Sequence, residues 1–327
     1  MALKTQLCVV FLASALGVLL IGPRAIRMLR ALKWLQPMRH EDCPPLIPLQ
    51  QAKQGTPTMG GLIVLGIAIL GAAAFGGFSG FEGWLVLGAV GSLGAMGCVD
   101  DWQKLRRPNA KGLRCMPKLL VALLVGAMFG MLSADPGAGF RQLVVPWLGE
   151  RVEVGWWWIP LSMAVIAGCA HAVNLSDGMD GLAVGCLSVA FAVLAVFAIT
   201  DPRSQLVAIW CASLPGECVG FLWFNSFPAS VFLGDVGALG LGAALGVLAL
   251  LSQAGLGLVI VGGIFVVEAL SVILQVASFR WRHQRRLFRV APLHHHFQLG
   301  GLAEHKLVVR FWIVGALLAA LGLSALS

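Results

Sequence analysis

Long apolar segments recur along the chain and are separated by short polar ones. A helix that crosses the hydrocarbon core of a bilayer needs about 20 mostly apolar residues. Ten segments approach that length, and we predict spans at about 5–23, 59–79, 83–99, 118–134, 156–173, 181–200, 205–223, 237–252, 256–279 and 308–326. The pattern predicts an all-α integral membrane protein of about ten transmembrane helices, with residues 1–327 forming a single polytopic membrane domain.

Composition supports this interpretation. The chain is 58% hydrophobic and only 12% charged, whereas soluble domains carry about 25% charged residues. Its beginning resembles a signal peptide, but no polar domain follows, so we interpret it as the first span. The eight cysteines show no CxxC spacing and lie mostly in apolar runs, Cys8 among them. We expect buried, reduced thiols rather than disulfides or a zinc site.

The basic residues predict the orientation. Nineteen of the 23 Lys and Arg residues fall in the loops after spans 1, 3 and 9 or at the ends of the adjoining helices. Basic residues collect on the cytoplasmic side of membrane proteins, so we expect these loops in the cytoplasm and both termini outside. Topology then accounts for the net charge of +8, and nucleic acid is not expected as a partner.

Paired carboxylates follow the third predicted span, in "CVDDWQKLRRPNAKG" (98–112). We expect Asp100 and Asp101 at a helix C-terminus, where the helix dipole disfavours negative charge. They would need compensating cations or a divalent metal. The basic residues available nearby are Lys104, Arg107, Lys111 and Lys118. An ordinary charged juxtamembrane loop explains this motif, taken alone, equally well.

A second polar motif, "NLSDGMDG" (174–181), separates two apolar segments. Asp177 and Asp180 are three apart, which on a helix places them on one face. Carboxylate oxygens beside glycines suit Mg²⁺ or a phosphate. The alternative is a polar turn in which the aspartates cap helices.

Two more motifs lie on the same predicted side. Asp235 falls just before the span expected at 237–252, where it could cap the helix, although a helix N-terminus also suits phosphate. The consecutive residues His294, His295 and His296 cannot share one helix face. Zinc sites usually space their histidines apart, so this run favours phosphate binding or loop structure.

Carboxylates, basic residues and histidines gathered on one face of a helical membrane protein fit metal-assisted phosphoryl transfer. A cation-coupled transporter is the alternative from a different class, but its site should lie near the middle of the bilayer. Only Glu217 and Glu268 are placed there, and neither has an evident partner in the sequence. We therefore favour an enzyme that acts on a phosphorylated substrate embedded in the membrane.

Seven motifs resemble the phospho-N-acetylmuramoyl-pentapeptide transferase family, in order, from about 50 to 315. They are "GTPTMGG", "VDDWQK", "HAVNLSDGMDGLA", "GFLWFN", "VFLGDVGALGLGAALG", "FVVEALSVILQV" and "APLHHHF". The resemblance implies a ten-span bacterial inner-membrane enzyme, commonly a homodimer, with a cytoplasmic active site. It implies transfer of phospho-MurNAc-pentapeptide from UDP to undecaprenyl phosphate with Mg²⁺, giving lipid I and UMP. The related UDP-GlcNAc:polyprenyl-phosphate GlcNAc-1-phosphate transferases share the carboxylate motifs, but "PLHHHF" is similar to the muramoyl enzymes.

The resemblance also implies residue roles. Asp100 matches a candidate base, Asp101 its acidic neighbour, and Asp235 a Mg²⁺ ligand. Asp177 matches a required acidic residue, which we expect to take part in catalysis and in metal binding. The remaining matches are His294, His295 and His296 on the phosphate side, Lys53 and Thr58 in a nucleotide-side loop, and Asn225, Asp180 and Phe232 at the uridine, with Phe232 stacking. We add Asn174 and Lys118 as substrate-binding candidates. The pair Pro215 and Glu217 departs from the family pattern, and the sequence gives no account of it.

Overall fold

The computed structural model describes residues 3–36, 53–106, 112–134, 140–200 and 205–326. Within these ranges, nine helices are long and apolar enough to cross a membrane. They are α1 (Leu3–Ala31), α4 (Phe81–Arg106), α5 (Cys115–Leu132), α6 (Trp158–Ser176), α7 (Leu182–Thr200), α8 (Gln205–Asn225), α9 (Gly234–Leu251), α11 (Gly263–Trp281) and α13 (Glu304–Leu326). A further apolar helix, α3 (Gly61–Ala74), has 14 residues and reaches only about 21 Å. Nine of the ten expected spans each coincide with one helix, and the predicted fold class is confirmed.

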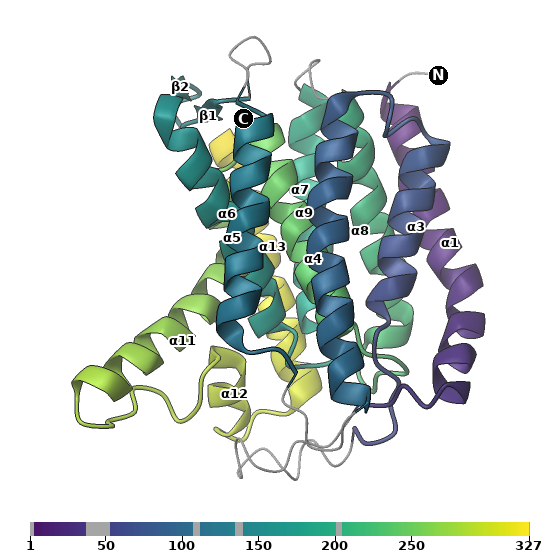
Figure 1. The fold of residues 1–327 in the computed structure, drawn as a ribbon, viewed down its shortest axis with the longest axis vertical. Helices are drawn as coiled ribbons and strands as arrows, with labels where there is room; N and C mark the ends of the chain where they lie inside the picture. Colours follow the sequence, from purple (N-terminus) through teal and green to yellow (C-terminus); the bar gives the residue numbers. More distant parts are fainter. Residues whose placement is uncertain (1–2, 37–52, 107–111, 135–139, 201–204, 327) are drawn as a thin grey trace.

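The span expected at 256–279 is not one continuous helix. The short helix α10 (Leu258–Val261) ends at Gly262, and α11 starts at the next residue. Glycine weakens a helix because it gains no side-chain contacts and loses more backbone freedom than other residues. Beyond the break, α11 leans away from the bundle (Figure 1).

Helix α9 forms the centre of the bundle, and 16 of its 18 residues are buried. Small residues let its neighbours approach its backbone closely, as is usual between membrane helices. A side chain at Gly242 would meet the α6 backbone at Ala170, and one at Gly97 of α4 would meet the carbonyl of Asp235. The first turn of α9 is therefore pressed against α4.

Helix α8 packs against α1 through the segment that holds Pro215 and Glu217, the pair for which the sequence gave no account. A side chain at Gly216 or Gly220 would strike backbone carbonyls of α1. Ser14 of α1 lies 2.9 Å from Ser213, whose hydroxyl donates a 2.6 Å hydrogen bond to Glu217. Glu217 is 0% exposed, and Ser213 is the partner that was not evident in the sequence.

The two ends of the bundle differ. Both ends of the described chain lie at the same end of the bundle as a small hairpin of β1 (Gln142–Val144) and β2 (Arg151–Glu153) (Figure 1). The strands pair antiparallel, with Leu143 opposite Val152, and a 3₁₀ turn, η3 (Gly155–Trp157), leads into α6. The sequence did not predict this hairpin. The polar motifs lie at the opposite end, next to the short helix α12 (Leu293–Gln298). The seven described cysteines are free thiols. Cys186, Cys211 and Cys218 are buried as expected, whereas Cys8 and Cys115 are exposed.

Candidate active site

Two aspartates expected at a helix end lie inside a helix instead. Helix α4 continues to Arg106, so Asp100 and Asp101 occupy its penultimate turns. Both are buried, at 0% and 4% exposure. The helix continues because lysine and arginine in its last turns complement the dipole there. The premise that these carboxylates stand at a helix C-terminus is wrong.

Five side chains form what we call the carboxylate–lysine cluster: Asp100, Asp101, Asp235, Lys104 and Lys118. The Lys104 ammonium lies 2.5 Å from Asp100, 3.3 Å from Asp101 and 3.1 Å from Asp235. The Lys118 ammonium, from α5, lies 2.8 Å from Asp100 and 2.6 Å from Asp235. Lys104 and Lys118 are thus the predicted compensating cations, whereas Arg107 and Lys111 lie outside the described residues.

Asp101 caps a helix other than its own. The backbone N–H of Val236 donates a 3.1 Å hydrogen bond to Asp101 Oδ2. The N-cap position of α9 is Leu233, which offers no side-chain bond. The expectation that Asp235 caps α9 is therefore wrong, because Asp235 lies within the first turn and faces the two lysines.

The carboxylates of this cluster fit a divalent cation. One oxygen each from Asp100, Asp101 and Asp235 lies within 4.8 Å of the others. Hard carboxylate oxygens are the ligands that Mg²⁺ takes from proteins. The Asp235 side chain is 17% exposed, which makes it the most accessible of the three. Asp177, also expected as a metal ligand, is not part of this group.

A second set of charges forms what we call the Lys53 bridge. The Lys53 ammonium lies 2.7 Å from Asp180 and 2.5 Å from Glu304 at the start of α13. Glu304 also accepts a 3.0 Å hydrogen bond from the backbone N–H of Asp180. Burial acts to lower the Lys53 pKa, but the two carboxylates outweigh it, and the pKa is raised. Sequence reasoning missed Glu304, which looks like an ordinary acidic residue in the first turn of a helix.

Asp177 and Asp180 do not share a helix face. Helix α6 ends at Ser176, Asp177 is its C-cap, and the chain turns through Gly181. No hydrogen bond or ion pair to the Asp177 carboxylate occurs within the described part of the chain. Burial raises the Asp177 pKa well above its ordinary value, and the charges of Asp235 and Asp101 raise it further. Asp177 therefore lies within electrostatic reach of both the carboxylate–lysine cluster and the Lys53 bridge.

Asn225 fixes the loops around this turn. Its amide oxygen accepts a 3.2 Å bond from Gly181 N–H, and its amide nitrogen donates a 3.0 Å bond to the Val231 carbonyl. Phe232 follows directly, with its half-buried ring centred 6.0 Å from the Lys53 ammonium. Two more candidates lie nearby in the fold, Thr58 buried in the loop before α3 and Asn174 half-buried near the end of α6.

His294 is held by a glutamate from the membrane span α11. Its Nδ1 lies 3.0 Å from Glu268 Oε2, and its backbone N–H donates a 3.1 Å bond to Glu268 Oε1. Both side chains are 0% exposed. His294 Nε2 has no partner within the described residues, and a side chain at Gly178 would collide with it. His294 is thus the partner of Glu268 that was not evident in the sequence. Helix α12 lies against the turn that carries Asp177.

The other two histidines of the motif contact different groups. The His295 ring lies 4.2 Å from that of His294, and its Nδ1 is 3.1 Å from Gln298 Oε1. Burial and the neighbouring His294 lower the His295 pKa to about 4, so this ring is neutral at pH 7. His296 Nδ1 accepts a 3.2 Å bond from the backbone N–H of Arg289. The three rings do not converge on one point, which agrees with the expectation from their spacing.

Comparisons with known proteins agree with this site. The family model described as glycosyl transferase family 4 matches residues 83–253. A second model, phospho-N-acetylmuramoyl-pentapeptide-transferase signature 1, matches residues 53–65, which include Lys53 and Thr58. These matches cover the whole carboxylate–lysine cluster and, of the Lys53 bridge, Lys53 and Asp180. The chain is therefore a membrane-bound transferase of glycosyl transferase family 4.

Similar proteins identify the family. The phospho-N-acetylmuramoyl-pentapeptide-transferase of Nitratidesulfovibrio vulgaris is 42% identical over 333 residues, covering 96% of this chain and 91% of its own. The proteins of the same name from Solidesulfovibrio magneticus and Methylacidiphilum infernorum are 41% and 42% identical, each covering 94% of this chain and 89% of its own. The chain belongs to the phospho-N-acetylmuramoyl-pentapeptide transferase family.

Proposed function

We propose that this chain transfers phospho-MurNAc-pentapeptide from UDP-MurNAc-pentapeptide to undecaprenyl phosphate, giving lipid I and UMP. The observation that carries the proposal is the carboxylate–lysine cluster, which gathers three carboxylates and two ammonium groups at the ends of membrane spans. Such a cluster suits phosphoryl transfer, where positioning and charge neutralisation supply most of the catalysis.

Asp235 is the residue best placed to hold Mg²⁺, with Asp101 and Asp100 beside it. When bound, Mg²⁺ would neutralise the charge of the donor pyrophosphate and of the leaving UMP. Lys104 and Lys118 then hold Asp100 and the remaining carboxylate oxygens in place, and they offer positive charge to a phosphate that enters between them.

The uridine would lie near Phe232. A half-buried aromatic ring beside the Lys53 bridge offers a stacking surface for a base, and Asp180 and Glu304 supply acceptors at its edge. Asn225 supports this arrangement indirectly, because both ends of its amide already bind backbone groups. Thr58 and Asn174 complete the nucleotide side of the proposal.

The lipid phosphate attacks directly. A phosphate monoester has its second pKa near 6, so at neutral pH most acceptor molecules are dianions and competent nucleophiles. The acceptor oxygen bonds to the phosphorus that bears the sugar, and the bond from that phosphorus to the UMP oxygen breaks. Asp177 is a better proton acceptor than Asp100 for the monoanion fraction. Its carboxylate is unpaired and its pKa is raised, whereas Asp100 is engaged by two lysines and by the N–H of Leu113.

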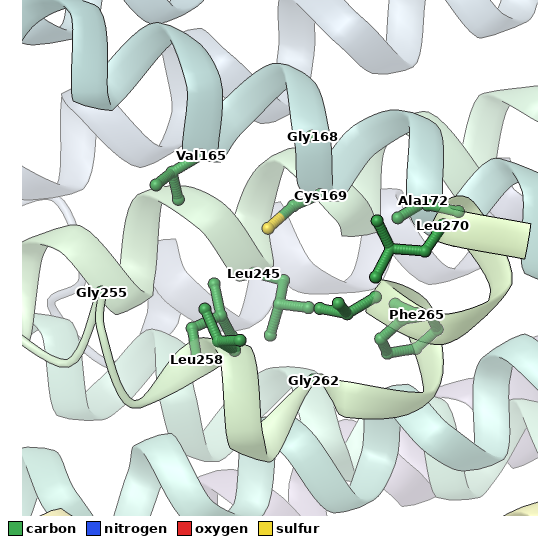
Figure 2. Close-up of a pocket in the computed structure, with 13 residues that line it drawn as sticks. Val165, Gly168, Cys169, Ala172, Leu245, Gly255, Leu258, Gly262, Phe265 and Leu270 are labelled. Carbon is green, nitrogen blue, oxygen red and sulfur yellow. The ribbon is translucent and has the colours of Figure 1, made fainter. Parts of the chain in front are cut away.

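An apolar pocket supports a prenyl substrate. It has a volume of about 240 Å³ and is lined by apolar side chains and glycines of α6, α9, α10, α11 and the residues that join them. Figure 2 shows Val165 and Cys169 of α6 above Leu245 and Leu258. Phe265 and Leu270 flank Glu268 along α11, so the pocket borders the helix that holds His294. A section of polyprenyl chain fits such a site.

We also propose that the protein resides in the bacterial inner membrane as a homodimer and a single polytopic domain, with the site facing the cytoplasm. The orientation is supported by the basic residues, because 19 of the 23 belong to the three loops, with their helix ends, on the side that carries the site motifs.

The reaction is tested with purified protein, Mg²⁺ and undecaprenyl phosphate, by offering UDP-MurNAc-pentapeptide or UDP-GlcNAc as donor and identifying the lipid product by mass spectrometry. The proposal expects product from the muramoyl donor. Product from UDP-GlcNAc alone would instead assign the chain to the GlcNAc-1-phosphate reaction.

The metal site is tested by Asp235→Asn. An amide is a poorer ligand for a hard cation than a carboxylate, so turnover should fall and its Mg²⁺ requirement should rise. Glu153→Gln, a matched loss of one exposed carboxylate at the other end of the bundle, serves as control. An unchanged Mg²⁺ dependence in Asp235→Asn would remove this residue from the metal site.

A further inference from the structure

The segment 280–289 carries five arginines and no acidic residue. We call it the arginine loop. Its arginines are Arg280, Arg282, Arg285, Arg286 and Arg289, and all five are exposed. Across the described residues, none of them pairs with a carboxylate. Such a concentration of unpaired positive charge is complementary to an anionic partner outside the chain.

The loop has a fixed backbone. The side-chain oxygen of Gln275 accepts hydrogen bonds from the N–H groups of Leu287 (3.0 Å) and Phe288 (2.8 Å), and its amide donates to the Phe288 carbonyl at 3.0 Å. The Ser278 hydroxyl donates to the Arg285 carbonyl at 2.9 Å. Two side chains of α11 thus fold the loop back onto the helix. Among the arginines, Arg286 donates to the Arg289 carbonyl at 3.5 Å and Arg289 to the Leu299 carbonyl at 3.0 Å.

The position of the loop indicates where its partner lies. It follows the end of α11 that leans out of the bundle, away from α4 and α9, which carry the carboxylate–lysine cluster (Figure 1). Trp281 is 83% exposed, and Ile273 and Phe279 on the same helix are 60% and 43% exposed. An apolar helix surface that faces lipid and ends in tryptophan marks the level of the lipid headgroups. The arginines therefore stand at the depth of lipid phosphates.

We propose that the arginine loop docks on the phosphate headgroups of anionic phospholipids of the bilayer, with Trp281 inserted beside them. Guanidinium groups bind phosphate oxygens in pairs, and clustered basic residues next to a membrane span attract anionic lipids. The polyprenyl phosphate substrate has a similar headgroup. The bulk phospholipid is favoured because the loop projects beyond the bundle instead of toward the cluster.

For the test, the full-length protein is reconstituted in nanodiscs of phosphatidylcholine with a minor fraction of phosphatidylglycerol. In each sample only one of the two lipids is brominated. Bromine quenches nearby tryptophans, and the difference between the wild-type protein and Trp281→Phe isolates the signal of Trp281. At equal mole fraction, brominated phosphatidylglycerol should quench this signal about fivefold more effectively than brominated phosphatidylcholine, as expected for attraction by several basic residues.

The triple variant Arg282→Gln/Arg285→Gln/Arg286→Gln should lose this preference. Its matched control, Arg24→Gln/Arg27→Gln/Arg30→Gln, removes the same charge from exposed positions near the end of α1 and should keep it. Equal loss in both variants would show a general charge effect and overturn the proposal, as would equal quenching by both lipids in the wild-type protein. Displacement of brominated phosphatidylglycerol by a small fraction of unlabelled undecaprenyl phosphate would assign the loop to the substrate instead.

Discussion

His294 binds Glu268 through two of its groups: the backbone N–H donates to Oε1 at 3.1 Å and to Oε2 at 3.4 Å, and ring Nδ1 lies 3.0 Å from Oε2. A carboxylate can only accept, so the contact assigns the ring proton to Nδ1. His294 Nε2 is then left as the ring atom that faces the turn at Gly178. A glutamate inside a membrane span thus sets the orientation of the histidine motif.

We predict that Glu268→Gln lowers kcat about 10- to 100-fold, the usual effect of removing a partner that orients a functional histidine. The amide offers one acceptor where the carboxylate offers two. The matched control is Glu217→Gln, because Glu217 is equally buried but binds Ser213, a residue of the α1–α8 contact. Steady-state kinetics of both variants in detergent decide the matter, and equal loss of kcat in both would contradict the positioning role.

Gly97 positions the cluster through close packing. Any side chain there would meet the carbonyl of Asp235, whereas Gly91 on the same helix has open space around it. We expect Gly97→Ala to push the first turn of α9 away from Asp101 and to lower turnover at least tenfold, with a loss of stability of about 1–3 kcal/mol from overpacking. Gly91→Ala should be neutral or slightly stabilising, since alanine favours helix. Similar activity and thermal stability of the two variants would argue against the tight α4–α9 contact.

Asp177 should limit stability at neutral pH. Burial raises its pKa in the folded protein, so the folded state binds this proton more tightly than the unfolded state does. Stability contributed by the protonated form is therefore lost as pH rises from about 4, the ordinary aspartate value. At pH 8 the free energy of unfolding of Asp177→Asn should exceed that of the wild-type protein by on the order of 1 kcal/mol, given partial solvent screening. The variant should therefore unfold at a higher temperature. The gain should shrink as the pH falls to 5 and approach zero near 4.

Thermal unfolding followed over that pH range checks the prediction, with turnover measured in parallel. The variant should be more stable at pH 8 and should lose turnover chiefly as the pH falls towards 6, where more of the acceptor is a monoanion that needs a proton acceptor. A stability difference that does not change with pH, or one that grows as the pH falls, would show that the Asp177 carboxyl is not destabilised by burial in the folded protein.

Phe232→Ala should weaken the nucleotide more than the lipid. Stacking of a base on an aromatic ring contributes about 1–3 kcal/mol, so KM for UDP-MurNAc-pentapeptide should rise roughly tenfold or more. The KM for undecaprenyl phosphate should change little. Phe75→Ala, another half-buried phenylalanine at the end of α3, controls for loss of ring volume. A change confined to the lipid KM would move Phe232 out of the uridine site.

The sequence predicted the helices well because a long apolar run in a membrane has few alternatives to helix, since every backbone polar group must be satisfied internally. It predicted their ends poorly. Helix α4 continues past Asp100 and Asp101 because Lys104, three to four residues further along, neutralises them. Asp177 ends α6 in a turn instead of lying on a shared helix face with Asp180. Charge pairs within one turn extend α4 past the apolar segment, and a hydropathy pattern does not detect such pairs.

Partners far apart in the chain were not predictable in this way. Glu304 meets Lys53 across 251 residues, and Glu268 meets His294 across 26. Each glutamate taken alone has an ordinary explanation, as a helix-start residue or as an isolated charge within a span. Only the packing of α11, α12 and α13 around the turn at 177–181 brings them to the site. A charge inside a membrane span is costly, and for Glu268 that cost was the one signal in the sequence that a partner had to exist.

The central claim is direct transfer to a lipid phosphate, and the amount of UMP released with and without the acceptor tests it most directly. Purified protein is incubated with Mg²⁺ and UDP-MurNAc-pentapeptide, and undecaprenyl phosphate is either supplied or omitted. We predict UMP and lipid-linked product in equal amounts when the acceptor is present, and no UMP above background when it is absent. Release of one UMP per protein without acceptor, with the sugar phosphate bound to an aspartate such as Asp100, would contradict the account.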